Sequence, residues 1–391
     1  MSLSFLGRIN QLRQQYFSKP IGFPDEDVQR RFLDGMDAPR DDIERSYLQY
    51  LCQKSCSAKS RLSPFKRWMS GLLVQVLLLR TEPERNDVKQ MSGRSMAAFI
   101  HTGVTRSIIP VSLQETYQIQ DFSYFGKRRL TKKDRQFFRQ TVWKRYKNYG
   151  DFCLKLLLRM EMYSYVLSQG TFQAVITHSE YSYTSSFLTE YCRRLGVEHI
   201  NVMHGDKLYD IRDAFFHFDR CYIWDEYYRK LFCALRAEPM QFRVELPPSM
   251  QPWEKPATPP EVDLTYYLQG ESPEQLQRIA AALHTLQVRG MVVAVRPHPR
   301  YTSPEAMRFF QDFLVEDCSI SIEQSILRTK RAVSRYSTVL LQASINGVSV
   351  VIDDLTAPER FAQLAELKYI MLSLPHTLLS EELRRVSEPQ P

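Results

Sequence analysis

Two short stretches, far apart in the chain, combine residue types that bind phosphate. The first is Arg296-Pro297-His298-Pro299-Arg300, which ends an apolar run. The prolines restrict the backbone, so the cationic side chains lose little entropy on binding, and a guanidinium group matches the geometry of phosphate oxygens. The histidine can add a hydrogen bond or a proton. We therefore expect Arg296, His298 and Arg300 to bind an anion; a proline-stiffened loop with solvated charges is the alternative.

The second stretch is SRYSTVLLQASINGVSVVIDD, residues 334–354, in which Ser337 and Thr338 lie where a strand gives way to a helix. Their hydroxyls and the free N–H groups of the first helical turn point to the same place, which favours phosphate binding. Helix capping alone would also explain the pair. Because the stretch follows His298 by one β-α unit, however, we expect both stretches to contact one phosphate.

Three residues of the N-terminal half are candidates for a general base: His204, Asp206 and Glu180. Each follows a predicted strand, His204 and Asp206 in the run HGDK and Glu180 in the run THSEYSYTSS. A histidine suits the role by its ordinary pKa, whereas a carboxylate needs apolar surroundings that raise its pKa. A purely structural hydrogen bond is the alternative for each.

Polar residues beside these candidates are expected to bind the second substrate. His178 and Ser179 begin a hydroxyl-rich run that can hold the hydroxyl groups of a saccharide, and Lys207 follows Asp206 directly. The alternative is that the run at 177–186 is only the polar start of a helix.

The elements that must position these residues alternate between strand and helix. In the C-terminal half, VDLTYYLQG, MVVAV, RAVSRYS and VSVVIDD are predicted strands, and helices are predicted between them, one of them opened by Ser272-Pro273 and closed by Gly290. Residues 173–205 show the same order of strand, helix and strand, and residues 150–170 predict a buried helix. The pattern predicts α/β architecture with two Rossmann-like domains and a cleft between them.

A proline-rich stretch marks the expected domain boundary. Residues 247–263 carry six prolines and show no periodicity, as is typical of a linker. We assign residues 1–246 to an N-terminal acceptor-binding domain whose first part is mostly helical, and residues 264–391 to a C-terminal nucleotide-binding domain. In parallel sheets ligands bind beyond the carboxyl ends of the strands, which is where every candidate residue falls.

Composition restricts the partners and the compartment. The formal net charge of +8 favours phosphates, acidic polymers or an anionic membrane surface. Seven cysteines without a CxxC pair argue against a disulfide framework or a structural zinc site. The chain begins without a signal-peptide pattern, and its longest apolar run, at 71–79, is too short to cross a bilayer. We expect a cytoplasmic protein.

The segment 126–148 holds ten Lys or Arg residues against one Asp, together with Phe137, Phe138 and Trp143. Such a segment fits either a solvated helical face or a patch that docks on the inner face of the cytoplasmic membrane. No nucleic-acid module surrounds it, so nucleic acid is not an expected partner. The sequence also lacks a P-loop, a GxGxxG after a strand, a GxSxG and an HExxH.

The order HGD, then RPHPR, then SRYSTVLLQASINGVSVV resembles the GT-B glycosyltransferases of bacterial capsule and lipopolysaccharide synthesis. It is similar to sialyltransferases and polysialyltransferases, with their His-Pro and Ser-Ser/Thr motifs, and to CDP-glycerol transferases with their HG, HP and S pattern. The resemblance spans about residues 170–355. It implies that His298, Ser337 and Thr338 hold the phosphate of a cytidine-activated donor. The acidic triplet that polysialyltransferases use as base is missing, so the base remains open among the three candidates.

We therefore expect an inverting glycosyltransferase that uses neither a metal nor another cofactor. The first-choice donor is CMP-sialic acid, and CMP-Kdo or a CDP-alditol is the alternative. The acceptor would be a capsule, O-antigen or lipooligosaccharide chain. Two other functions remain open: a UDP-sugar 2-epimerase of the same fold, and a non-catalytic capsule assembly protein.

Overall fold

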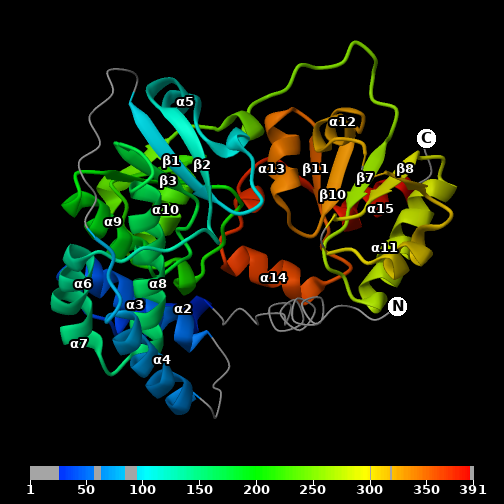
Figure 1. The fold of residues 1–391 in the computed structure, drawn as a ribbon. Coiled ribbons are helices and arrows are strands. Elements are labelled where there is room, and N and C mark those ends of the chain that lie inside the picture. Colours follow the sequence, from blue (N-terminus) through cyan, green and yellow to red (C-terminus); the bar gives the residue numbers. More distant parts are fainter. Residues whose placement is uncertain (1–25, 57–62, 84–94, 300, 318, 388–391) are drawn as a thin grey trace, which may run out of the picture.

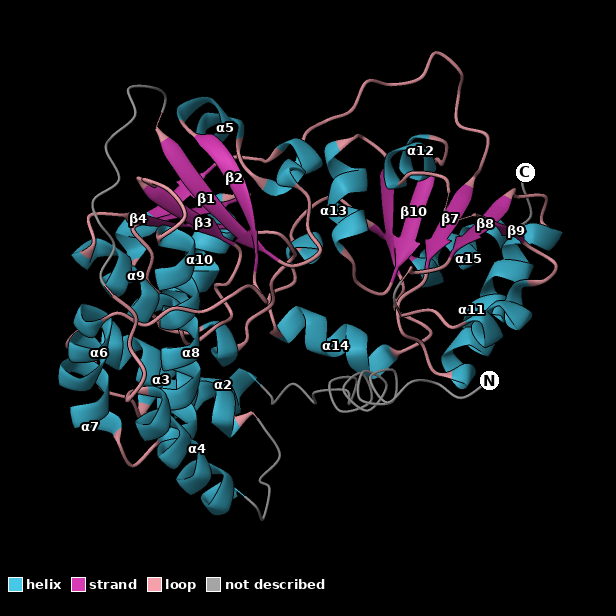
Figure 2. Ribbon diagram, viewed as in Figure 1, coloured by secondary structure: helices cyan, strands magenta, loops and turns pink. Residues whose placement is uncertain are grey.

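The computed structural model describes residues 26–56, 63–83, 95–299, 301–317 and 319–387. Two separate sheets, each flanked by helices, form its two halves (Figure 1, Figure 2). All strand pairings in both sheets are parallel. The prediction of α/β architecture with two Rossmann-like domains is confirmed.

The first sheet has the order β2-β1-β3-β4-β5-β6. Its strands are β1 (Met96–His101), β2 (Gln118–Ser123), β3 (Ala174–Thr177), β4 (Glu198–Val202), β5 (Arg220–Ile223) and β6 (Phe242–Val244). The central strands β3 and β4 are buried on both faces, as expected of a parallel sheet covered by helices.

The second sheet has the order β12-β11-β10-β7-β8-β9. Its strands are β7 (Leu264–Tyr267), β8 (Val293–Arg296), β9 (Leu314–Val315), β10 (Arg331–Ser334), β11 (Ser349–Ile352) and β12 (Thr377–Leu378). Counted within this domain the order is the dinucleotide-binding one, 3-2-1-4-5-6, whose direction reverses between β7 and β10. A ligand of this domain is therefore expected beyond the ends of these two strands.

The helices of the first domain are α2 (Glu26–Asp34), α3 (Asp42–Ser55), α4 (Ser63–Leu77), α5 (Val111–Thr116), α6 (Lys132–Phe138), α7 (Lys144–Tyr146), α8 (Gly150–Leu167), α9 (Ser185–Arg194) and α10 (Glu226–Ala234). Those of the second are α11 (Pro273–Val288), α12 (Ile322–Leu327), α13 (Thr338–Ile345), α14 (Pro358–Glu366) and α15 (Leu379–Ser387). The predicted signals at the ends of α11 are confirmed: Ser272 forms a capping box, and Gly290 has a φ of 88°.

The two domains pack directly against each other. One hydrophobic cluster contains buried residues of both, among them Tyr209 and Phe215 of the first domain and Leu340 and Leu364 of the second. The backbone N–H of Tyr209 also donates to the carbonyl of Leu367 at 2.7 Å. Helix α14 lies between the two halves in Figure 1. The stretch 247–263 connects β6 to β7, and its role as a flexible linker stays a prediction.

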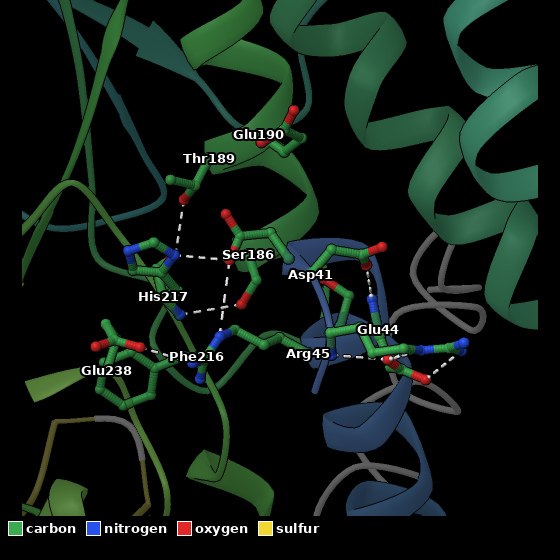
Figure 3. A network of polar contacts seen from close by, with 12 residues as sticks. Asp41, Glu44, Arg45, Ser186, Thr189, Glu190, Phe216, His217 and Glu238 are labelled. Carbon is green, nitrogen blue, oxygen red and sulfur yellow. Dashed lines mark hydrogen bonds and ion pairs between the residues drawn. The ribbon is translucent and has the colours of Figure 1, made fainter. Parts of the chain in front are cut away.

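A polar network holds helix α3 in place against α9 (Figure 3). The Nδ1 atom of His217 lies 2.6 Å from Asp42, and the backbone N–H of His217 donates to Ser186 at 3.0 Å. Arg45 is paired with Glu238 at 2.6 Å. These contacts hold α3 against the segments that precede β5 and β6, and the far end of α3 reaches the loops that follow β3 and β4.

Candidate functional site

A cleft of about 780 Å³ lies between the carboxyl ends of the two sheets. Loops that follow β4, β7, β8 and β10 all contribute to its wall, together with α14. The residues used below are Asp206, Lys207, His298, Ser337, Thr338 and Arg360. The cleft includes the point between β7 and β10 at which the strand order reverses, which is where a parallel sheet of this kind binds its ligand.

The loop after β8 brings His298 to the cleft. The backbone N–H of His298 donates to Thr302 at 2.8 Å, and its ring stacks on Tyr301 with a centroid distance of 4.4 Å. Its Nδ1 accepts a hydrogen bond from the backbone N–H of Tyr301 at 3.2 Å. The ring is thus oriented by its own loop. Arg300 lies outside the described residues.

Arg296 also lines the cleft, but its guanidinium group is already paired. It lies 3.1 Å from the fully buried carboxylate of Glu316 and donates to the carbonyl of Ile320 at 2.7 Å. A guanidinium held in this way keeps less capacity for a phosphate than the sequence suggests. Its contacts therefore indicate that Arg296 shapes the loop as well as facing the cleft.

Ser337 is the N-cap of α13, as the sequence predicts. Its Oγ accepts a hydrogen bond from the backbone N–H of Val339 at 3.2 Å. Its own N–H donates to the phenol oxygen of Tyr369 at 3.1 Å. Thr338 reaches across the cleft, where its Oγ1 accepts from the backbone N–H of Asp206 at 3.4 Å. The start of α13 thus faces the loop after β4.

Asp206 lines the cleft, and its carboxyl group has an altered pKa. Burial raises the pKa of its carboxyl to about 6, although hydrogen bonds oppose this rise. The Tyr228 hydroxyl and the backbone N–H of Lys207 both donate to Oδ1, at 2.8 and 2.7 Å. Neither bond uses Oδ2. A carboxylate with a pKa near neutrality and an oxygen left for a substrate hydroxyl has the properties of a general base.

Glu180 forms an ion pair with Lys207. It is fully buried, and its Oε1 lies 2.7 Å from the ammonium group of Lys207. Burial opposes its ionisation, but Lys207 overcomes this effect and lowers the pKa of Glu180 to about 2. Asn201 donates to its other oxygen at 3.1 Å. Such an ion-paired carboxylate is a weak base, so its geometry favours Asp206 over Glu180 for proton transfer.

The two histidines of the N-terminal domain form a pair. The rings of His178 and His204 lie edge to face, with a centroid distance of 4.4 Å. Burial lowers the pKa of His178 to about 4 and also lowers that of His204, which favours the neutral form of both rings. The Nδ1 atoms of both are buried without a hydrogen-bond partner in the described structure. Neither ring is among the described residues of the cleft wall.

Ser179 forms hydrogen bonds with neighbouring residues of the fold. Its backbone N–H donates to Asn201 at 2.7 Å, and its hydroxyl lies 3.1 Å from that of Thr177. Its carbonyl accepts from the Ser185 hydroxyl at 2.6 Å. These bonds close the turn between β3 and α9, which supports the structural interpretation of the hydroxyl-rich run. The backbone of the same turn is held from α3, because Gln49 donates to the carbonyl of Glu180 at 3.0 Å.

Several residues of the cleft wall were not predicted from the sequence. Asp213 lies 3.8 Å from Lys207, and burial raises its pKa to about 6 despite this cation. Arg360 of α14 lies over the ring of Tyr336 at 4.7 Å. No local sequence pattern distinguishes Asp213 or Arg360 from ordinary surface residues. Their position depends on how α14 and the loop after β4 pack.

The segment 126–148 forms α6, a π-helical turn (Arg139–Trp143) and α7. Phe137 and Phe138 point into the core, where the ring of Phe137 stacks on that of Phe187 at 5.9 Å. These two aromatic rings are therefore not available to a partner. The exposed side chains of the segment are mainly basic, among them Lys132, Lys144 and Lys147.

No family model matches the chain, and no curated protein matches it in sequence. Solved structures with a similar fold include a putative UDP-N-acetylglucosamine 2-epimerase from Listeria monocytogenes, with 11% identity and a TM-score of 0.46 over 75% of this chain and 87% of that one. The UDP-GlcNAc 2-epimerase from Methanocaldococcus jannaschii has 12% identity and a TM-score of 0.44 over 75% and 92%. The wall teichoic acid polymerase TagF has 9% identity and a TM-score of 0.41 over 89% and 88%.

Proposed function

We propose that the protein is an inverting glycosyltransferase of GT-B architecture that uses a cytidine-activated donor. The observation that carries the proposal is the contact across the cleft. There the start of α13 faces Asp206. Helix starts of this kind bind phosphate. The carboxyl group of Asp206 has a pKa of about 6, which suits a general base. A leaving-group site and a base therefore lie on opposite domains of one cleft.

The donor phosphate would bind at the C-terminal domain. The positive end of the α13 helix dipole can attract its oxygens and the side chain of His298 can donate to them, and Arg360 adds a positive charge from α14. These groups stabilise the negative charge that develops on the departing nucleotide. Because they can supply this stabilisation themselves, the proposed mechanism needs no metal ion.

The acceptor hydroxyl would be activated from the N-terminal domain. Asp206 takes the proton of the hydroxyl, and the oxygen then attacks the anomeric carbon of the donor sugar. The bond between that carbon and the phosphate oxygen breaks, and the nucleotide leaves with the electron pair. One displacement inverts the anomeric centre. His204, two residues before Asp206, is the alternative base, although its ring is not among the described residues of the cleft wall.

The choice of a cytidine nucleotide rests on the motif order in the sequence, with CMP-sialic acid as the first-choice donor and CMP-Kdo or a CDP-alditol as alternatives. A saccharide or glycolipid of the cell surface is the proposed acceptor. Each domain supplies its own part of the cleft, which suits a reaction between two substrates. An epimerase would instead act on a UDP-sugar alone.

A thermal shift experiment with CMP, CDP and UDP tests the nucleotide class. We expect CMP or CDP to raise the melting temperature of the protein. Stabilisation by UDP alone would support an epimerase and overturn the proposal. No stabilisation by any nucleotide would support a non-catalytic assembly role and would overturn it as well.

The His298→Ala variant tests the phosphate site. We expect it to lose transfer activity and nucleotide stabilisation while it keeps the melting temperature of the wild type without ligand. His284→Ala is the matched control, because His284 is an exposed residue on α11 and does not line the cleft. Normal turnover by His298→Ala would contradict the assignment.

A further inference from the structure

A second pocket, of about 400 Å³, lies in the N-terminal domain between α8, α4 and the loop after β2. We call it the α8 pocket. The residues that define it are Ser70, Tyr124, Phe125, Arg128, Lys155 and Arg159. It combines cations with aromatic rings, and the residues that line the main cleft do not include any of these six.

Two cations of the α8 pocket are held by aromatic rings and not by carboxylates. The Lys155 ammonium lies 4.0 Å from the ring centre of Tyr183, and the Arg159 guanidinium lies 3.3 Å from that of Tyr124. In the part of the chain that the structure describes, neither cation forms an ion pair. Burial and the charge of Arg159 lower the pKa of Lys155 to about 8. The two positive charges therefore repel each other in a partly buried pocket.

The acidic residue in the pocket wall does not neutralise them. Asp151 pairs with Lys54 at 2.9 Å and accepts hydrogen bonds from the Tyr50 hydroxyl at 2.9 and 3.0 Å. The Asp151 carboxylate is therefore paired with residues of α3. An anion bound between Lys155 and Arg159 would replace lost hydration and remove their mutual repulsion.

The α8 pocket lies close to the main cleft. Tyr181 belongs to the cleft wall, and burial raises its pKa, while Lys207 from the cleft and Arg159 from the pocket both oppose this rise. The phenol is therefore within electrostatic reach of both sites. Phe125 is 76% exposed at the pocket and offers a flat apolar surface to a sugar ring.

We propose that the α8 pocket binds an anionic group of the acceptor, a phosphate or a carboxylate, between Lys155 and Arg159. The part of this proposal that concerns the acceptor rests on the proposed glycosyltransferase function. The anion site itself rests only on the pocket, its cations and their missing counterion among the described residues.

The test is an NMR titration of the lysine side chains of the intact protein with inorganic phosphate and, separately, with acetate. A bound anion should raise the pKa of Lys155 from its low value, and the more effective of the two indicates the preferred group. The signal is assigned with Lys155→Met. An unchanged pKa of Lys155 with both anions would overturn the site.

Kinetics separate this proposal from the proposed function. Lys155→Met should raise KM for an anionic acceptor about tenfold and leave kcat unchanged, as expected for one lost charge-assisted contact. Lys132→Met, on the exposed surface of α6, is the matched control. An unchanged KM would overturn the acceptor assignment. If phosphate shifts the pKa of Lys155 but no nucleotide binds the cleft, the proposed function fails and the anion site remains.

A different observation concerns the outer face of α4, which carries a stripe of apolar side chains in contact with solvent. They recur at helical spacing, and Trp68 is 62% and Leu79 72% exposed. The stripe consists of Phe65, Trp68, Met69, Leu72, Leu73 and Val76 of α4, together with Leu79 in the turn just beyond the helix. The other face of α4 packs on α8, where Gly71 and Gly150 allow a close approach of the two backbones.

The charged residues within α4 and the turn that follows it are positive. Residues 63–81 contain Lys66, Arg67 and Arg80 but no Asp or Glu. Lys147 of the basic segment lies beside α4, where it lines a shallow groove with Trp68 and Trp143. An apolar helix face with tryptophan and basic residues at its border matches the interface of a bilayer with anionic headgroups.

We infer that the α4 stripe docks on the surface of an anionic phospholipid bilayer. The helix would lie in the plane of the interface, with the stripe among the upper acyl chains and the basic residues at the headgroups. No helix in the described ranges is long and apolar enough to cross a membrane. Because Ser70 of the same helix lines the α8 pocket, docking would bring that pocket close to the headgroups.

Co-sedimentation with liposomes tests this inference. We expect binding to vesicles of equal parts phosphatidylcholine and phosphatidylglycerol, and weaker binding to phosphatidylcholine alone. The double variant L72S/L73S should lose binding and keep the far-UV spectrum of the folded protein. Val288→Ser, at a 69% exposed valine on α11, is the control and should bind normally.

Two results would overturn the bilayer assignment. One is equal lipid binding by L72S/L73S and the wild type. The other is a wild-type dimer in light scattering that becomes monomeric in L72S/L73S without any lipid binding by either protein, because the stripe would then be an interface between two copies of the chain.

Discussion

The ammonium group of Lys207 lies 2.7 Å from the carboxylate of Glu180, and both residues belong to loops at the carboxyl edge of the first sheet. Glu180 is fully buried, and the Asp213 carboxylate also lies 3.8 Å from the ammonium group. The pair joins the loop after β3 to the loop after β4. It therefore holds the backbone that presents Asp206 to the cleft.

Removal of one partner of this pair should destabilise the protein strongly. Lys207→Met leaves the buried Glu180 charge unpaired, and we expect the free energy of unfolding in urea to fall by about 3–5 kcal/mol. The double variant E180Q/K207M should lose less. Lys330→Met, which breaks the more exposed pair with Asp263, is the control and should cost about 1 kcal/mol or less. Equal losses for the two lysine variants would contradict the prediction.

The same pair should make stability depend on pH in acid. The pKa of Glu180 falls from 4.5 to about 2 on folding, so its ionised form stabilises the folded state. This contribution is complete above pH 4.5 and disappears as the pH falls towards 2. We expect the melting temperature of the wild type to fall more steeply over this range than that of E180Q/K207M. Parallel curves would show that the pair does not have the expected effect.

Asp206 should set the acid limb of the activity profile. With a pKa of about 6 it is protonated, and inactive as a base, below that pH. We expect kcat/KM to fall below pH about 6 and Asp206→Asn to lower kcat by roughly 10²–10⁴-fold, the usual contribution of a general base. Nucleotide binding by Asp206→Asn should be near normal. A smaller loss than that caused by His204→Gln would transfer the role to His204.

Tyr228 should tune this acid limb as a positioning residue. Its hydroxyl donates to Oδ1 of Asp206 at 2.8 Å and stabilises the ionised form. Tyr228→Phe removes the bond, so the pKa in the pH profile of kcat/KM should move upwards. Tyr227→Phe is the control, since the Tyr227 hydroxyl makes no hydrogen bond to the described residues. A profile that is identical in Tyr228→Phe and the wild type would contradict the assignment.

The cap of α13 should affect both stability and donor binding. Ser337→Ala removes the bond to the N–H of Val339 and should cost about 1 kcal/mol of stability. Ser272→Ala, which removes the cap of α11 at a residue that is not part of the described cleft wall, should cost a similar amount. Only Ser337→Ala should also weaken binding of the cytidine nucleotide, measured by calorimetry. Equal nucleotide affinities would reduce Ser337 to a structural cap.

The amino-acid sequence by itself determined the elements that carry the site. Ser337 before the run TVLLQASI predicts a capped helix, and α13 begins at Thr338. Likewise the Ser272-Pro273 start and Gly290 end predict α11. These signals are local, because a helix start depends on residues within one turn of it. The alternation of strands and helices then predicted two α/β domains.

Only the tertiary structure decided which candidate residues line the cleft and which are held in ion pairs. Glu180 and Asp206 were both candidate bases in the sequence, but Glu180 is paired with Lys207 and only Asp206 of these two lines the cleft among the described residues. The pairing of Arg296 with Glu316 and the cations of the α8 pocket were likewise outside any local pattern. The physical reason is that burial and charge pairing depend on groups brought together by packing, and partners such as Glu180 and Lys207 are far apart along the chain.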